Sequence, residues 1–179
     1  FHRDNIGSQQ IIRSGDINLM IAGRGIVHSE RTPPDQIQAD HHNMMHGLQV
    51  WIGLPLEHEQ CDPAFFHYSH KEIPKVKISQ EINGELLMGQ YLDKISPVKT
   101  LSATLLMNLF CKKNAQHQFA FSEKEIGFLI VSGSALINRE KLQTNDLIIF
   151  NDMSKIDFEC PAYRNSGFGG YAWQHHSSR

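Results

Sequence analysis

The sequence predicts an all-β fold of the sandwich or barrel type, and two observations support this prediction. Short apolar stretches, such as residues 17–21, recur between turns that contain Gly, Asn and Asp. No stretch shows an apolar period that indicates a helix longer than one or two turns. The chain has 179 residues, of which 40% are hydrophobic and 20% charged, so it can bury a substantial core in one large domain or two small ones.

Two strands are expected around a glycine-rich corner at residues 23–25. Residues 17–21 precede this corner and residues 26–30 follow it, and the two glycines allow the chain to turn sharply. A polar segment, 31–45, comes next, and its adjacent prolines exclude it from the middle of a sheet. Residues 46–55 contain Val, Trp and Ile, which favour strands, so we expect a further strand there.

The second half continues this pattern of strands and turns. Residues 56–75 are polar and mixed, and they indicate a linker with an extended piece. Two strands are expected within residues 75–92 around a turn at Asn83-Gly84, the strongest short hairpin signal in the chain. Residues 101–111 predict a buried strand, and residues 125–152 predict three strands separated by two turns.

The two halves share one short pattern. SGDINLMIA (14–22) and TNDLIIFND (144–152) both place a turn that ends in Asp directly before an apolar strand. This similarity indicates a weak internal repeat of two related β modules.

Charge and cysteine content indicate which partners and which cellular location to expect. The formal net charge of -2 gives no electrostatic reason to expect a nucleic acid or an anionic membrane as a partner. No run of 18 apolar residues is present, so no membrane-spanning helix is expected. The three cysteines are odd in number and widely spaced, which predicts no disulfide framework and favours a reducing, cytoplasmic location.

His28 and Glu30 form the candidate site, because residues two apart on a strand point to the same face. A buried carboxylate beside a neutral imidazole costs free energy unless a cation or hydrogen-bond donors satisfy it, and a divalent metal would remove that cost. Imidazole with carboxylate suits iron and other first-row metals. An exposed ion pair or an acid–base pair is also compatible with this spacing.

The residues around this pair resemble the pirin family, a branch of the cupin superfamily. The resemblance rests on FHRDNIG (1–7), SGDI (14–17), AGRGIVHSE (22–30) and MHGLQVWIGLP (45–55). It is strong over residues 1–56 and loose over residues 57–160. It implies a bicupin, in which two β-sandwich or jelly-roll barrels are joined, with the first barrel here truncated at its N-terminus.

The resemblance also implies a division of the chain into three parts. Residues 1–56 would form the C-terminal part of the N-terminal barrel, and residues 57–97 a connecting segment with strands shared between the barrels. Residues 98–179 would form the C-terminal barrel. The tail after Cys160 contains three glycines and no clear period, so it could supply a last strand or fray, and a frayed tail would leave this barrel incomplete.

Pirins hold one iron in the N-terminal barrel through three histidines and one glutamate. The family's last histidine and its glutamate fall on His28 and Glu30 of this chain. The first two histidine ligands belong to a His-x-His motif that is expected upstream of Phe1, and His2 is not expected to replace them. Glu30 could also accept a proton from a substrate hydroxyl if it left the metal.

Gln49 and His46 are further candidates, because metal-ligating residues need partners that orient them. Each has an alternative role. Gln49 could hydrogen-bond the backbone instead, and His46 could cap the strand that it opens.

The resemblance implies a non-haem Fe(2+) dioxygenase of the quercetin 2,3-dioxygenase type, with a flavonoid-like aromatic small molecule and O₂ as substrates. One alternative is an iron-dependent regulatory protein that binds a transcriptional or metabolic-enzyme partner. Another is a metal-free, truncated remnant. Direct nucleic acid binding and membrane association are not expected, and the sequence leaves the three interpretations open.

Overall fold

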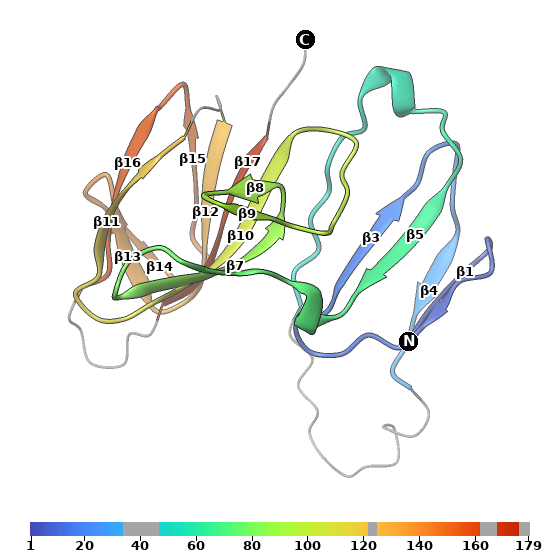
Figure 1. Ribbon diagram of the computed structural model, residues 1–179, viewed down its shortest axis with the longest axis horizontal. Helices are drawn as coiled ribbons and strands as arrows, with labels where there is room; N and C mark the ends of the chain where they lie inside the picture. Colours follow the sequence, from blue (N-terminus) through green and yellow to red (C-terminus); the bar gives the residue numbers. More distant parts are fainter. Residues whose placement is uncertain (34–46, 122–124, 162–167, 176–179) are drawn as a thin grey trace. The chain divides into compact units, whose positions relative to one another are not determined.

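The computed structural model describes residues 1–33, 47–121, 125–161 and 168–175 (Figure 1). The elements in these ranges are strands, apart from two single-turn 3-10 segments, η1 (Leu56–His58) and η2 (His70–Glu72). The predicted all-β class is therefore confirmed. Neither helical segment in these ranges has the length and apolar character that crossing a membrane requires. The chain divides into two compact units, Phe1–His70 and Lys71–Arg179.

The first unit contains a three-stranded antiparallel sheet and a separate strand pair. Its strands are β1 (His2–Asp4), β2 (Gln9–Gln10), β3 (Ile17–Ile21), β4 (His28–Glu30) and β5 (Ala64–Tyr68). In the sheet, β1 lies between β2 and β4. The pair is formed by β3 and β5. The glycine-rich corner therefore separates β3 from β4, as predicted.

Apolar burial contributes little to the first unit. His2 is the only buried residue among residues 1–33 and 47–70. Large apolar side chains are exposed here, including Trp51 at 88% and Val27 at 73%. Strand pairing and turn hydrogen bonds, rather than an apolar core, define the described part of this unit.

The strand predicted over residues 46–55 is absent from residues 47–55, and His46 lies outside the described residues. Val50 is 43% exposed, and Trp51 is almost fully exposed. Side chains that favour strands stabilise one only where neighbouring strands pack against them. This segment pairs with no strand in the described part of the chain, so its composition misled the prediction.

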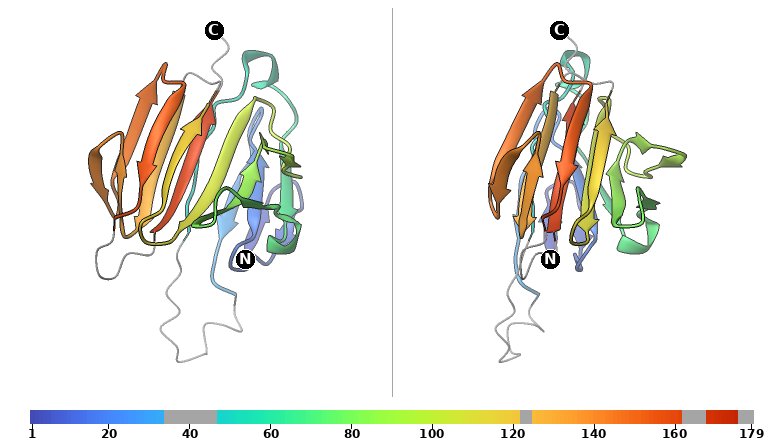
Figure 2. Two further views of the ribbon diagram at one scale, coloured as in Figure 1. Left: turned by 60° about the vertical axis from the view of Figure 1, so that its left-hand side comes forward. Right: turned by 90° about the vertical axis from the view of Figure 1, so that its left-hand side faces the viewer.

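The second unit contains two larger antiparallel sheets and a hairpin (Figure 2). In spatial order, the six-stranded sheet contains β15 (Leu147–Asn151), β12 (Glu125–Ser132), β17 (Phe168–His175), β10 (Thr104–Cys111), β7 (Ile82–Met88) and β6 (Lys75–Lys77). The four-stranded sheet contains β11 (Gln116–Ala120), β16 (Lys155–Glu159), β13 (Ser134–Ile137) and β14 (Glu140–Gln143). The hairpin is formed by β8 (Gln90–Tyr91) and β9 (Lys94–Ile95).

The tail after Cys160 supplies a central strand, which was one of the two outcomes left open by the sequence. Strand β17 lies between β12 and β10 (Figure 1). Its backbone pairs with β10 over eight residues and with β12 over seven. The sheet is therefore continuous from β15 at one edge to β6 at the other.

The apolar core lies in the second unit and draws side chains from both sheets. Phe119 and Phe158 come from the four-stranded sheet, and Phe128 comes from the six-stranded sheet. The ring centroid of Phe128 lies 5.9 Å from that of Phe119 and 6.4 Å from that of Phe158. All three rings are at most 2% exposed. Their burial makes the interior of this sandwich the main source of stability in the chain.

The hairpin predicted at Asn83-Gly84 is wrong, because both residues lie inside β7. The chain instead turns at residues 79–81, where the Ser79 hydroxyl oxygen accepts hydrogen bonds from the backbone of Glu81 and Ile82 at 3.1 Å. Gly84 pairs with strands on both sides, and a Cβ there would lie 3.3 Å from the Asn108 carbonyl oxygen. The glycine serves close strand packing rather than a turn.

The internal repeat is visible as one turn built twice. The Asp16 carboxylate accepts a hydrogen bond from the Arg13 backbone nitrogen at 2.8 Å, and the Asp16 nitrogen donates to the Arg13 carbonyl at 3.1 Å. Asp146 and Gln143 make the same two contacts at 2.8 and 2.9 Å. The residue before each aspartate has a positive φ, 82° at Gly15 and 74° at Asn145. Each turn leads directly into a strand, so the shared sequence pattern reflects shared local structure.

Candidate metal centre

Strand β4 presents the two predicted ligands on one face. His28 and Glu30 are two residues apart, and Ser29 between them points to the opposite side. Strand β1 runs antiparallel beside β4, with His2 opposite Glu30 and Asp4 opposite His28. Directly opposed residues project from the same face of a sheet. Two imidazoles and two carboxylates therefore gather on this face.

The glycine-rich corner fixes where β4 begins. Gly23 has a φ of 49°, and a Cβ at this position would overlap the carbonyl oxygen of Cys61. That oxygen accepts a hydrogen bond from the Arg24 backbone nitrogen at 3.0 Å. The Arg24 side chain is exposed and pairs with Asp62 at 2.6 Å. The backbone of the corner thus packs against the segment at Cys61 shortly before β4 begins at His28. Arg24 lies on the surface.

Gly23→Ala is expected to destabilise the first unit by at least about 1–2 kcal/mol, because a side chain is strained in the left-handed region and has no room against Cys61. The measurement is hydrogen exchange of the β3 and β4 amides, which should accelerate. Gly53→Ala is the control, since a Cβ at Gly53 meets nothing within 4 Å. Equal exchange in the two variants would contradict the role of the corner.

His2 is the buried member of the cluster, with 1% of its surface exposed. Its ring stacks on Phe65 at a centroid distance of 4.0 Å and an angle of 8°, and it lies 5.7 Å from the His28 ring. Its Nε2 lies 3.1 Å from Asp4 Oδ2. Its Nδ1 is buried without a hydrogen-bond partner and lies 3.7 Å from Glu30 Oε1. One nitrogen is therefore anchored, and the other faces a predicted ligand.

Asp4 anchors this arrangement from the last position of β1, directly before the turn to β2. Its Oδ1 accepts hydrogen bonds from the backbone nitrogens of Ile6 at 3.1 Å and Ser8 at 2.8 Å. Burial by itself would raise the pKa of Asp4, but the hydrogen bonds from Ser8, His2 and Ile6 outweigh it and lower the pKa to about 2. Asp4 is therefore an ionised hydrogen-bond acceptor throughout the neutral range.

Sequence reasoning gave His2 no part in the site, and the structure places it directly beside Glu30. A signal was present in the sequence. His2 and Asp4 are two residues apart, as His28 and Glu30 are, so each pair would share a face on a strand. Only the pairing of β1 with β4 shows that the two faces are the same one.

The donor set on β4 is of the right kind for a first-row divalent metal, since it combines imidazole with carboxylate. The Glu30 side chain is 62% exposed and His28 is exposed, so an ion can reach both. The buried Nδ1 of His2 has no hydrogen-bond partner, which costs about 1–3 kcal/mol of folding free energy. Such an unsatisfied buried atom in a native protein calls for an explanation, and an ion site beside it is one. Among the residues that the structure describes, no group of three or more His, Cys, Asp or Glu side chains is placed to hold one metal.

The structure does not bring Gln49 to this cluster by strand pairing. Gln49 is exposed and lies in the segment that forms no strand. His46, the other residue expected to orient the ligands, lies outside the described residues. Neither assignment is tested by these positions, and both stay predictions.

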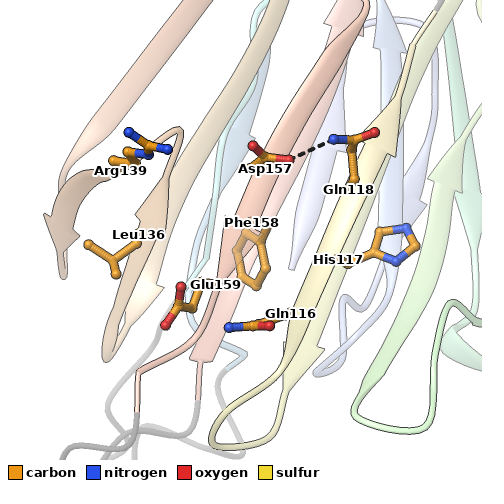
Figure 3. A pocket seen from close by; sticks show the side chains of 8 residues that line it. All are labelled: Gln116, His117, Gln118, Leu136, Arg139, Asp157, Phe158 and Glu159. Atoms are coloured by element: carbon orange, nitrogen blue, oxygen red, sulfur yellow. Dashed lines mark hydrogen bonds between the residues drawn. The ribbon is translucent and has the colours of Figure 1, made fainter.

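A polar concavity of about 510 Å³ lies on the four-stranded sheet of the second unit (Figure 3). Gln116 and Gln118 from β11 line it together with Asp157 and Glu159 from β16, and Gln118 donates a hydrogen bond to Asp157 at 2.8 Å. Arg139 also lines it.

Cys111 on β10 is a buried thiol. Burial and the neighbouring Cys160 raise the pKa of Cys111 to about 12, so this thiol is not a reactive nucleophile.

Comparison with solved structures identifies the class of protein. The fold matches a quercetin 2,3-dioxygenase from Acinetobacter baumannii with a TM-score of 0.84 and 29% identity, covering 98% of this chain and 55% of that one. It also matches the bacterial pirin YhhW of Escherichia coli, solved in complex with nickel(II), with a TM-score of 0.70. That match has 19% identity and covers 99% of this chain and 68% of that one, so it shows the fold alone. The predicted bicupin fold class is confirmed.

The sequence comparisons point to one family. Residues 1–52 match the family model described as Pirin. A pirin-like protein from Caulobacter vibrioides is 43% identical over 150 residues, which cover 83% of this chain and 51% of that protein. The predicted resemblance to the pirin family is thereby confirmed. The chain spans about half the length of the curated relatives it matches.

Proposed function

We propose that this chain contributes His28 and Glu30 as ligands to a ferrous iron site of a cytoplasmic, pirin-like dioxygenase. The observation that carries the proposal is the shared face of β4, where an exposed imidazole and an exposed carboxylate stand side by side. The likeness to a quercetin 2,3-dioxygenase supports it. The remaining ligands would come from outside the described residues.

Iron bound here would supply Lewis acidity and a path for electrons between O₂ and a flavonoid-like aromatic substrate. The protein side chains would do the rest. His28 and Glu30 would hold the ion. Glu30 is exposed enough to accept a proton from a substrate hydroxyl.

The test is to load the purified chain with Fe(II) under argon, desalt it, and measure bound iron by elemental analysis. Oxygen uptake is then followed with quercetin as the probe substrate. Retained iron with quercetin-dependent oxygen uptake is the expected result. Retained iron without oxygen uptake would favour the iron-dependent regulatory alternative. Failure to retain iron would overturn the assignment of His28 and Glu30 as ligands in this chain.

A further inference from the structure

We propose that the polar concavity on the four-stranded sheet binds a small, neutral, polyhydroxylated molecule such as a sugar. This concavity lies in the second unit, whereas the candidate metal ligands lie on β4 of the first. The inference therefore does not rest on the proposed iron site. The volume of the concavity, about 510 Å³, falls within the range of about 300–1,000 Å³ that is usual for small-molecule sites.

Strand pairing arranges the polar side chains of this concavity as a grid. Gln116 of β11 lies directly opposite Glu159 of β16, and Gln118 lies opposite Asp157 in the same pair of strands. Residues that are directly opposed or two apart share one face of a sheet, so these four side chains project together. On the other face of the same strands, Phe158 packs into the aromatic core. The packed core thus holds the backbone beneath the polar grid in place.

Asp157 links the grid to the turn between β13 and β14. Gln118 Nε2 donates a hydrogen bond to Asp157 Oδ1 at 2.8 Å (Figure 3). The Asp157 backbone nitrogen donates to Asn138 Oδ1, and the Asn138 nitrogen donates to the Asp157 carbonyl oxygen, both at 2.8 Å. Asn138 is the first residue of the two-residue turn, since Ile137 pairs with Glu140. These bonds hold the turn beside β16, and Arg139 with it.

Arg139 lies in a backbone conformation that disfavours a side chain. The φ angles of Asn138 and Arg139 are 48° and 71°, both in the left-handed region. A two-residue hairpin turn of this kind favours glycine at its second position, because an L side chain there costs free energy. The chain nevertheless has an arginine at this position, and Arg139 lines the concavity (Figure 3). A ligand that accepts a hydrogen bond from the guanidinium would explain the choice of residue.

Three of the lining side chains have hydrogen-bonding capacity to offer a ligand. Among the side chains that the structure describes, none forms a hydrogen bond or an ion pair with that of Gln116, Arg139 or Glu159. The set combines a carboxylate that accepts, a guanidinium that donates, and a carboxamide that does both. Glu159 is half-buried, so its carboxylate has lost part of its hydration and would gain from a bound donor.

The charges of the lining select the class of ligand. Two carboxylates and one guanidinium line the concavity, and burial lowers the pKa of His117, so this ring adds no positive charge at neutral pH. An anion would be repelled, and a cation would leave Arg139 without an acceptor. A hydroxyl group both donates and accepts, so several hydroxyls on one molecule satisfy Glu159 and Arg139 together. Leu136, opposite Glu159 on β13, adds an apolar contact that suits the C–H groups of a sugar ring.

The first test compares three probes that share one ring, namely glucose, glucuronic acid and glucosamine. Each is titrated into the full ¹⁵N-labelled chain, and the shifts of the backbone amide signals are followed. We expect glucose to shift the signals of residues 116–118 and 157–159 and to bind at least about 10-fold more tightly than glucuronic acid. If glucose leaves these signals unchanged, or if either charged probe binds more tightly than glucose, the proposal is wrong.

The second test separates ligand binding from folding. Arg139→Gly removes the guanidinium and relieves the left-handed backbone. Glucose binding should therefore weaken about 10-fold, while the midpoint of thermal unfolding stays at or above that of the wild type. Asn145→Gly is the matched control, because Asn145 also has a positive φ, 74°, and does not line the concavity. This control should bind glucose as the wild type does, and equal affinities in the two variants would refute the proposal. No metal is added in either test, so the outcome is independent of the iron site.

Discussion

Glu30→Ala and His28→Ala are each expected to lower the affinity of the chain for nickel(II) by more than about 100-fold, as measured by competition with a chromogenic chelator. Each change removes one of the two donors that β4 supplies, and loss of a ligand should exceed the 10- to 100-fold effect of losing a residue that only orients one. Both side chains are exposed, so the fold should be unaffected, which circular dichroism would verify.

The matched controls for this experiment are Glu57→Ala and His58→Ala. They remove the same two residue types from η1, in the same unit but away from β4. Their nickel(II) affinity should equal that of the wild type. An equal loss of nickel(II) affinity in all four variants would mean that the ion binds non-specifically to surface side chains. Unchanged nickel(II) affinity in Glu30→Ala would show that this carboxylate is not a ligand.

Phe128→Ala is expected to lower the free energy of unfolding of the second unit by about 3–5 kcal/mol. The Phe128 ring is fully buried and lies 5.9 Å from Phe119 and 6.4 Å from both Phe121 and Phe158, measured between ring centroids. Alanine would leave a cavity where the two sheets meet, and the surrounding rings cannot all move to fill it. Urea denaturation followed by circular dichroism measures the loss.

Phe110→Ala provides the comparison for Phe128→Ala. Phe110 lies on β10 of the same sheet but is 45% exposed, so its truncation should cost much less. The two variants remove the same atoms, and only burial differs between them. If they destabilised the chain equally, the apolar cluster between the sheets would not be the main support of this unit.

The first unit is expected to respond less to Phe128→Ala than the second. It forms a separate compact unit, and among its described residues only His2 is buried. Its stability therefore depends on strand pairing and on contacts such as the Gly23 corner rather than on the aromatic cluster. Hydrogen exchange resolved by residue would show whether the β4 amides stay protected when the second unit is weakened.

Much of the local structure could be predicted because it depends on neighbouring residues. The turns that end in Asp16 and Asp146 are closed by contacts three residues back, so the same short pattern built them twice. The shared face of His28 and Glu30 follows from the two-residue period of a strand. The predictions that failed concerned pairing between strands. Asn83-Gly84 has the composition of a hairpin turn, yet both residues pair with β10 on one side and β6 on the other and so lie within β7.

The all-β class, the turns that end in Asp16 and Asp146, and the shared face of His28 and Glu30 were determined by the sequence alone, because side-chain alternation and turn chemistry act over a few residues. Only the tertiary structure decided that residues 47–55 form no strand, that the C-terminal tail enters the middle of a sheet, and that His2 lies against Glu30. The physical reason is register. Which residues face each other across two strands depends on how the whole sheet aligns, and no spacing within a single strand encodes that alignment.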